Sequence, residues 1–225
     1  MVQAQRNWII NDLKNSDAQW KFLLLHRAVY SAGKNINKPD TLAMRETVIE
    51  IVDETGVDMV LSGHDHMYFR TENVKADAVV EAETVTEVWN GIETEFAVNP
   101  DGTTHILPST AGTKRYSVNE DAVAPILDCA ALARDTDEGG VFATVSLDSE
   151  HFVYNAYMVD DETKETKLID SYAIKKTERE AAVEDYEELP TDQFTTFTQN
   201  IVNLVREVIA VLITYLTKVL PAMVF

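Results

Sequence analysis

Two short apolar runs with a helix-like segment between them constrain the fold of this chain more than any other feature. The runs are "WKFLLLH" at 20–26 and "VDMVLSG" at 57–63, and each has the length of a buried strand. The segment between them is "KPDTLAMRETVIEIVDETG" at 38–56. Pro39 near its start and Gly56 at its end are common signals of where a helix begins and ends. Its apolar side chains Leu42, Ile49 and Val52 are expected on one face. The predicted order is strand, helix, strand.

This order predicts where three histidines meet. A helical crossover usually joins parallel strands, whose carboxyl ends lie at the same edge of the sheet. His26 ends the first run, and His64 and His66 follow the second. In open α/β sheets this edge is also where ligands bind. We therefore expect His26, His64 and His66 to lie close together at one edge.

Metal binding is the chemistry that best explains these histidines. Imidazole is a common metal ligand, and histidines at i and i+2 after a strand can point to two neighbouring ions. A two-metal site holds both oxygens of an in-line phosphoryl displacement and activates water near neutral pH. An isolated His-x-His more often consists of turn residues with ordinary hydrogen bonds, and this alternative stays open. The grouping with His26 and Gly63 favours the metal site.

The rest of the chain up to about residue 176 reads mainly as β-sheet. Residues 79–112 alternate β-prone runs with Asn-Gly and Asp-Gly turns, the pattern of hairpins. Further strands are expected at 140–148, 151–160 and 167–176, and a short amphipathic helix at the N-terminus. His105 and His151 fall in predicted strands, so we expect them to be structural histidines with satisfied hydrogen bonds.

The C-terminal part divides the chain into three predicted segments: a domain at 1–176, an acidic linker at 177–193 and an amphipathic helix at 194–225. The apolar stripe of that helix is expected to pack on the domain or to self-associate. Charged residues interrupt the stripe, so no transmembrane span is predicted. The stripe consists of Phe194, Phe197, Ile201, Leu204, Val208, Val211 and Tyr215.

Charge and cysteine content exclude some classes of function. The formal net charge is −19, and no cluster of Lys and Arg is present, so a nucleic-acid partner is not expected. Cys129 is the single cysteine, so an internal disulfide is ruled out. We expect its side chain to pack as a small apolar group. The opening "MVQAQRNWII" is too short an apolar run for a secretory signal.

Three motifs carry a family resemblance. "GHDHMYFRT" at 63–71 resembles the last metal-binding motif of calcineurin-like metallophosphoesterases, and in particular that of the purple acid phosphatase branch. "LLLHRAVYS" at 23–31 is similar to the preceding His-x-Pro-x-Tyr segment, with Ala28 in place of the Pro. "NWIINDLKNSDAQWK" at 7–21 resembles the Trp-containing helix before it, and the similarity continues to about residue 176.

The resemblance implies a fold and a set of ligands. The fold would be mixed α/β, in α+β layers: the C-terminal half of a metallophosphoesterase β-sandwich flanked by helices, with the C-terminal amphipathic helix added. His26 and His64 would bind one metal and His66 the other. The complete protein would use two divalent or mixed-valence ions of Zn, Fe or Mn, and would be secreted or at the cell surface. Tyr68 and Arg70 would support the loop. Independently of the resemblance, an extended path through residues 64–66 would turn Asp65 away from the two histidines, so we expect Asp65 to make a loop hydrogen bond.

The remaining ligands of the family are missing from this sequence. They come from an Asp at a strand end, a Gly-Asp-x-x-Tyr motif and a Gly-Asn-His-Glu motif, yet none of the eight glycines precedes Asp or Asn. We therefore expect the chain to be the later part of a longer catalytic domain, with an incomplete site. The predicted function is hydrolysis of phosphate esters by a binuclear metal centre in the parent protein. The alternative is an inactive truncated fragment that associates through its C-terminal helix.

Overall fold

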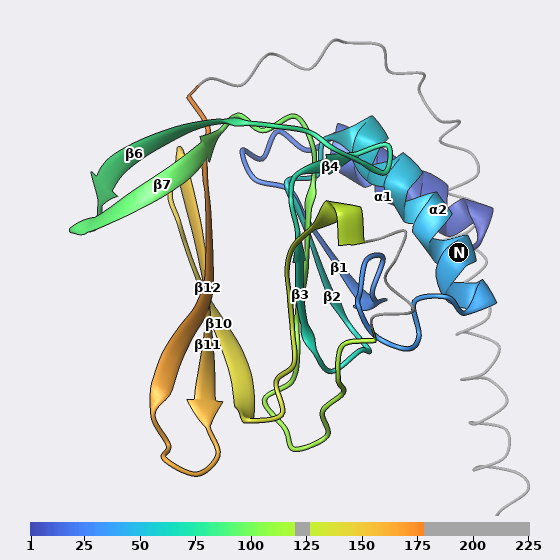
Figure 1. Cartoon of the computed structure of the whole chain (residues 1–225). Helices are drawn as coiled ribbons and strands as arrows, with labels where there is room; N and C mark the ends of the chain where they lie inside the picture. The colour runs from blue at the N-terminus through green and yellow to red at the C-terminus, as the bar shows by residue number, and fades with distance from the viewer. Residues whose placement is uncertain (120–126, 178–225) are drawn as a thin grey trace, which may run out of the picture. The chain divides into compact units, whose positions relative to one another are not determined.

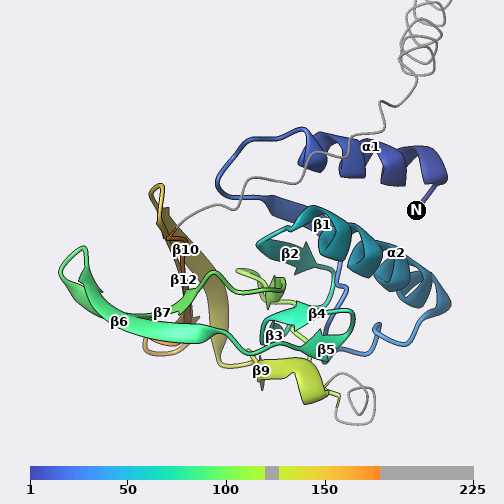
Figure 2. The same cartoon turned by 90° about the horizontal axis from the view of Figure 1, so that it is seen from above.

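The computed structural model describes residues 1–119 and 127–177, and within these residues the chain forms three layers. Helices α1 (Gln3–Lys14) and α2 (Pro39–Thr55) lie against one side of a first five-stranded sheet (Figures 1 and 2). A second five-stranded sheet lies on the opposite side (Figure 1). The predicted α+β sandwich with flanking helices is confirmed. The predicted C-terminal helix at 194–225 lies outside the described residues, as does the predicted linker apart from Thr177.

The first sheet has the strand order β1-β2-β8-β3-β9. Strand β2 pairs in parallel with both β1 and β8, whereas β3 runs antiparallel to β8 and β9. The predicted strand, helix, strand unit is therefore present as β1, α2 and β2. The strands are β1 (Phe22–Arg27), β2 (Met59–Gly63), β8 (Thr104–Pro108), β3 (Tyr68–Thr71) and β9 (Ala130–Arg134).

The second sheet has the order β10-β11-β12-β7-β6 and contains the hairpins expected from the sequence. Asn90 and Gly91 join β6 to β7 with φ of 51° and 80°, the positive values that a tight hairpin turn requires. The strands are β10 (Gly139–Leu147), β11 (His151–Asp160), β12 (Thr166–Lys175), β7 (Ile92–Val98) and β6 (Glu83–Trp89). The smaller elements are β4 (Val74–Lys75), β5 (Ala78–Val79) and the 3₁₀ turn η1 (Leu127–Cys129).

The first sheet buries both of its faces because side chains alternate along its strands. Val60, Phe69 and Leu107 pack toward the helices, in one cluster with Val48 and Val52 of α2. Their sequence neighbours point the other way, into the cluster between the two sheets. Each fully buried side chain of this kind contributes about 1.5–3 kcal/mol. The neighbours are Met59, Tyr68 and Ile106, which meet Phe152, Tyr154, Met158 and Ile174 of the second sheet.

Helix α2 begins and ends as predicted, and its buried face includes part of the predicted one. Pro39 occupies the start of the helix, and Gly56 ends it with φ of 62°. The buried residues of the helix are Thr41, Val48, Ile51, Val52 and Thr55, and Ile49 packs against the same core cluster as Val52. The sequence predicts Leu42 on one face with Ile49 and Val52, but its side chain is 43% exposed.

Strand β1 is less buried than its apolar sequence predicted. It lies at the edge of the first sheet, and Leu24 is 71% exposed. Leu23 and Leu25 pack toward the helices, whereas Phe22, on the same side as Leu24, packs between the sheets. Both faces of β1 are thus only partly buried.

His105 lies on β8 in the layer between the first sheet and the helices. Its side chain is 3% exposed, and its ring meets the ring of Tyr30 edge-on at 4.6 Å. Nδ1 has no hydrogen-bond partner within the described part of the chain, so the expectation of a fully satisfied histidine is wrong here. Burial lowers the pKa of His105 to about 3, because the charged ring would lose its hydration.

We expect this histidine to make the fold acid-sensitive. The folded-state pKa lies below the ordinary value of 6.5, so the unfolded chain binds more protons between these values. Stability should therefore fall as the pH falls from about 6.5 toward 3, with a slope of up to about 1.4 kcal/mol per pH unit from this residue. His105→Leu should remove that part of the slope while the protein stays folded at pH 7. Urea unfolding across this pH range measures the slope, and equal slopes in both proteins would contradict the prediction.

Candidate metal centre

The parallel pairing of β1 and β2 places His26 beside the turn that follows β2. Leu25 pairs with Ser62 and Arg27 with Gly63, and the register shifts between them at His26. A Cβ atom on Gly63 would lie 3.4 Å from the carbonyl oxygen of His26, at the limit of ordinary van der Waals contact. The two strand ends are therefore closely packed at this point.

The two imidazoles meet at a distance that suits a shared metal ion. His26 Nε2 lies 3.3 Å from His64 Nδ1, and the rings are almost perpendicular, at 79°. Histidine nitrogens bind zinc at about 2.0–2.1 Å, so two of them on one tetrahedral ion lie about 3.3–3.4 Å apart. The spacing of this pair fits a common metal. Of the predicted grouping of His26, His64 and His66, the contact between His26 and His64 is present, whereas the approach of His66 to this pair stays a prediction. The role of all three as ligands stays a prediction as well.

A tight turn at His64 directs the side chains of this loop. His64 has φ of 76°, and the N–H of Asp65 donates to the carbonyl oxygen of Gly63 at 3.0 Å. A hydrogen bond across three residues with a positive central φ defines a strained γ-turn. The sequence-based assumption of an extended path through Asp65 is therefore wrong. Its predicted role in loop hydrogen bonds is confirmed.

Asp65 holds the loop from inside the protein. Its side chain is 2% exposed, and Oδ2 accepts a 2.8 Å hydrogen bond from Ser31 Oγ while Oδ1 accepts one from Asn35 Nδ2. Ser31 Oγ in turn accepts from the N–H of Gly33, whose missing Cβ leaves room for the carboxylate. The turn after β2 is thus fixed to the segment after β1.

His66 is oriented by a different set of partners. Its Nδ1 lies 2.5 Å from the carbonyl oxygen of Lys114, and its ring stacks on Tyr116 with centroids 4.8 Å apart and planes 12° apart. The N–H of Tyr116 donates to the carbonyl oxygen of His66 at 2.9 Å. Metal-binding histidines commonly use one ring nitrogen for such a hydrogen bond, which leaves the other for the ion. His66 therefore has Nε2 available as a ligand.

Electrostatics keep His64 in the form that binds metals. Burial lowers the pKa of His64, and the nearby guanidinium of Arg27 lowers it further. The carboxylate of Asp65 acts in the opposite direction and is the weaker influence. Because a metal takes the neutral imidazole, these effects reduce the cost of proton loss on binding.

The described residues contain no complete set of metal ligands. Across 1–119 and 127–177, no three His, Cys, Asp or Glu side chains are placed to hold one ion together. Asp65, the carboxylate nearest in sequence to the histidines, is occupied by Ser31 and Asn35. Hard metals that handle phosphate also require oxygen ligands. The histidines fit the nitrogen half of such a site.

Tyr68 and Arg70, which follow His66 on β3, serve the packing of the two sheets. Tyr68 Oη donates to Asp170 Oδ2 at 2.7 Å, and Arg70 donates to both oxygens of the same carboxylate, at 2.6 and 3.0 Å. The guanidinium and the carboxylate are 12% and 8% exposed. Both side chains thus anchor the end of the histidine loop to β12.

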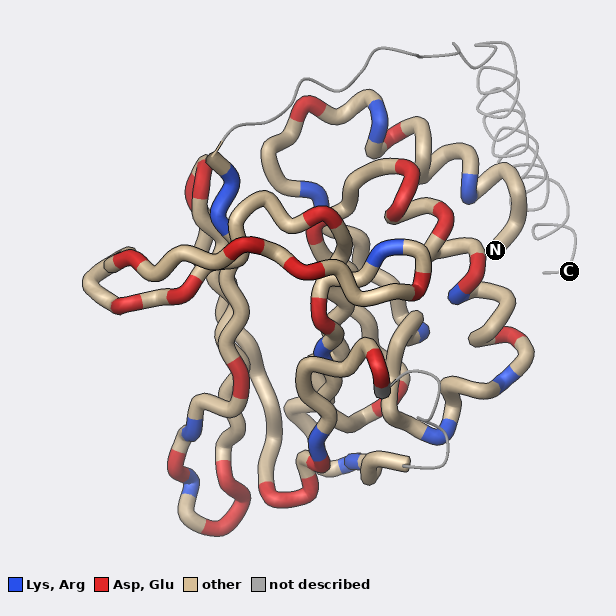
Figure 3. The backbone as a smooth tube through the Cα atoms, turned by 45° about the horizontal axis from the view of Figure 1, so that its top comes forward, with Lys and Arg blue, Asp and Glu red and all other residues tan. Residues whose placement is uncertain are grey.

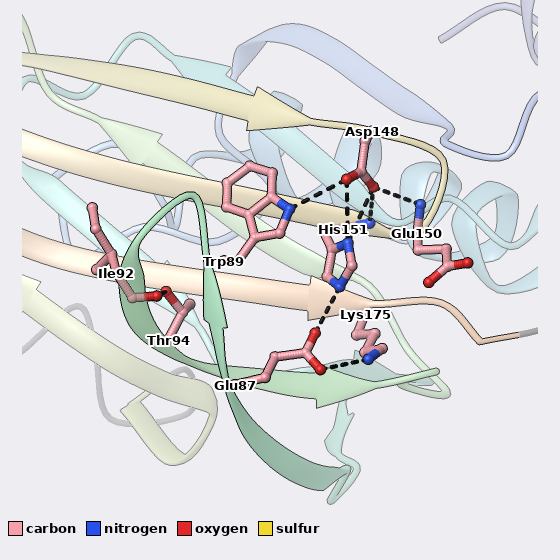
Figure 4. A network of polar contacts seen from close by, with 8 residues as sticks. All are labelled: Glu87, Trp89, Ile92, Thr94, Asp148, Glu150, His151 and Lys175. Atoms are coloured by element: carbon pink, nitrogen blue, oxygen red, sulfur yellow. Dashed lines mark hydrogen bonds and ion pairs between the residues drawn. The ribbon is translucent and has the colours of Figure 1, made fainter.

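The remaining histidine, His151, belongs to a polar network on the second sheet (Figure 4). Its Nε2 lies 2.6 Å from Glu87 Oε1, and its Nδ1 lies 3.2 Å from Asp148 Oδ1. Trp89 Nε1 also donates to Asp148, and Lys175 donates to Glu87. The network holds the β6–β7 hairpin to β11 and β12, so the structural role predicted for His151 is confirmed.

Cys129 is buried, as expected, and burial raises the pKa of its thiol. Sequence reasoning did not identify Ser31, Asn35 or Tyr116 as members of the site. No motif marks them, because they meet Asp65 and His66 only through the fold.

The relatives that match the chain in sequence include two phosphatases. It is 29% identical over 89 residues to purple acid phosphatase 17 of Arabidopsis thaliana, a match that covers 39% of this chain and 25% of the relative. It is 26% identical over 163 residues to an acid phosphatase of Aspergillus ficuum, covering 71% of this chain and 23% of the relative. No protein-family model matches the chain.

A solved structure shares the fold. The chain superposes on a purple acid phosphatase from seeds of yellow lupin (Lupinus luteus) with a TM-score of 0.53 at 18% sequence identity. The superposition covers 76% of this chain and 28% of that protein. The chain therefore spans about a quarter of the length of the relatives it matches.

The role of Asp65 can be tested by removing one of its oxygens. Asp65→Asn places an amide donor against the donors of Ser31 and Asn35, so it should lower the free energy of unfolding by about 1–3 kcal/mol. Asp101→Asn makes the same chemical change where the side chain is 78% exposed, and it should cost less than about 0.5 kcal/mol. Chemical denaturation compares the two variants, and equal losses would show that Asp65 does not hold the loop.

Proposed function

Because the chain is similar to the C-terminal part of calcineurin-like metallophosphoesterases of the purple acid phosphatase branch, we propose that the protein hydrolyses phosphate esters with a binuclear metal centre. This chain would contribute His26, His64 and His66. The similarity itself confirms the resemblance predicted from the sequence, and the phosphatase names of the relatives support a phosphate ester as substrate.

The 3.3 Å separation of His26 Nε2 and His64 Nδ1 is the observation that carries this proposal. His26 lies on β1 and His64 in the turn that follows β2, and the distance between their nitrogens is one that two ligands on a single ion would have. His66 lies two residues further on and keeps Nε2 available, so it would serve the second ion. When bound, two ions of Zn, Fe or Mn would polarise the phosphoryl oxygens and lower the pKa of the attacking water.

The residues of this chain would prepare the site for that chemistry. The turn at His64 and the buried carboxylate of Asp65 fix the imidazoles before any ion binds. Such preorganisation reduces the entropy lost on binding. The oxygen ligands would have to come from outside the described residues, which supply no carboxylate to the histidines.

That last observation favours a second candidate function. A chain with only the nitrogen ligands would be catalytically inactive and would act by association, through the amphipathic helix predicted at 194–225. Self-association through that helix and a secreted or cell-surface location remain predictions. None of the described helices has the length and apolar character that crossing a membrane requires.

Zinc titration tests the proposed ligands directly. The chain should bind zinc weakly, because a pair of imidazoles leaves an ion short of ligands. His26→Ala and His64→Ala should each weaken this binding by at least about tenfold, since each removes half of the pair. His66→Ala should leave this first site in place. Calorimetry that finds two tight equivalents, or binding indifferent to His26→Ala, would contradict the ligand assignment.

The activity of the chain alone provides a second test. With zinc, manganese or iron added, its hydrolysis of an aryl phosphate should stay close to the rate of the metal in buffer. Without a bridging carboxylate, two ions are not held close enough to share the attacking water. Turnover that requires metal and disappears in His64→Ala would show that the site is complete after all, through other ligands or through an oligomer.

A further inference from the structure

Beside His66 lies a cationic group of side chains that the metal site does not use. We infer that Lys34, Lys114 and Tyr116 form a platform that binds a second phosphate group of the substrate. The inference rests on the proposed function, since it places the platform next to a phosphate held by the histidine site. It extends that function by naming a substrate class: phosphate esters and anhydrides with a further phosphate.

Tyr116 is the centre of this platform. One ring contact is the stacked imidazole of His66, with the centroids 4.8 Å apart. Lys34 Nζ lies 4.6 Å from the centre of the same ring, and Lys114 Nζ lies 5.7 Å from it. An aromatic ring attracts ammonium groups at these distances through its quadrupole. Two lysines from distant parts of the sequence are thus gathered at one ring, which itself rests on a proposed metal ligand.

Hydrogen bonds hold the ring and its backbone in place. The N–H of Tyr116 donates to the carbonyl oxygen of His66, and the carbonyl oxygen of Lys114 accepts from Nδ1 of the His66 ring. Arg115, between them, forms two hydrogen bonds to the carboxylate of Asp161, at 2.5 and 3.1 Å. The platform is therefore part of the ordered loop.

The segment that carries Lys34 is attached to the same loop. The N–H of Asn119 donates to the carbonyl oxygen of Ala32 at 2.8 Å. Ser31 and Asn35, on either side of Lys34, bind the buried carboxylate of Asp65. Lys34 and Lys114 therefore keep their relative position through the fold and through Tyr116, although both side chains are exposed.

Ion pairs among the described residues do not neutralise these two lysines. The protein has twice as many acidic as basic residues, 38 against 19, and the acidic residues are spread over helices, loops and both sheets (Figure 3). Like Lys38, Arg134, Lys164 and Lys167, neither Lys34 nor Lys114 forms an ion pair within the described part of the chain, whereas most basic side chains do. Those that do include Arg6, Lys14, Arg27, Arg45, Arg70, Lys75, Arg115, Lys175 and Lys176.

These features fit an anion better than an uncharged group. Each ammonium group keeps N–H donors for charge-assisted hydrogen bonds, and phosphate offers several acceptor oxygens to two of them at once. An uncharged group would gain nothing from either lysine. Because both lysines are exposed, the attraction should weaken as salt is added.

Binding of pyrophosphate to the metal-free full-length chain tests the platform independently of catalysis. By calorimetry at low salt, pyrophosphate should bind more tightly than orthophosphate. The Lys34→Ala/Lys114→Ala variant should bind it about tenfold more weakly, because it loses hydrogen bonds between charged groups. Lys34→Arg/Lys114→Arg should retain most of the binding. The imidazole NMR signals of His66 should shift on titration in the wild type and not in the double alanine variant.

Two control variants distinguish the platform from a general effect of positive charge and from the histidine pair. Lys164→Asn/Lys167→Ala removes the same charge elsewhere and should leave binding unchanged, and Asn tolerates the positive φ of 61° at residue 164. His26→Ala/His64→Ala should also still bind pyrophosphate, even if the metal-site proposal fails. Absent binding, equal loss in the two lysine variants, or loss in the histidine variant would each overturn the platform.

Discussion

The parallel pairing of β1 with β2 is the constraint on which the rest of the structure depends. It aligns Phe22 with Met59 and Leu24 with Leu61, and it requires a crossover connection, which α2 supplies. The helix then covers one face of the sheet, so the other face is free to pack against the second sheet. The same pairing ends with His26 next to Gly63. The meeting of His26 and His64 is therefore a consequence of the strand pairing.

A second buried interaction connects this edge to the rest of the protein. The carboxylate of Asp170 on β12 accepts hydrogen bonds from Tyr68 and Arg70, which lie two and four residues after His66. A buried, bidentate pair is costly to break, at about 3–5 kcal/mol when one partner is removed, because the other charge is left without compensation. The histidine loop is therefore fixed at both ends: by β2 and Asp65 before His66, and by the second sheet after it. Motion of the loop would require this ion pair or the Asp65 network to open.

The sequence predicted the elements whose signals are local. The apolar runs and end signals gave β1, α2 and β2, and Asn90-Gly91 gave the β6–β7 hairpin. It did not predict β3, which has four residues and pairs with strands that begin at Thr104 and Ala130. Nor could it show that Leu42 lies outside the buried face of α2, because packing against the sheet decides which apolar side chains are covered. The γ-turn at His64 was not predicted for a similar reason. The positive φ of this histidine is held by contacts, such as those of Asp65, that only the fold creates.

The same distinction explains why the nitrogen half of the candidate site could be proposed from sequence while its surroundings could not. Histidines at the ends of neighbouring strands are visible as a pattern, since topology alone brings strand ends together. Tyr116 and Lys114 come from a loop that begins after β8, and that loop reaches His66 through main-chain hydrogen bonds that any residue could make. Contacts of this kind do not require a particular residue type, so the sequence does not indicate them. The ligands of a site can thus be predicted from topology, whereas the groups that orient them and select the substrate have to be found in the structure.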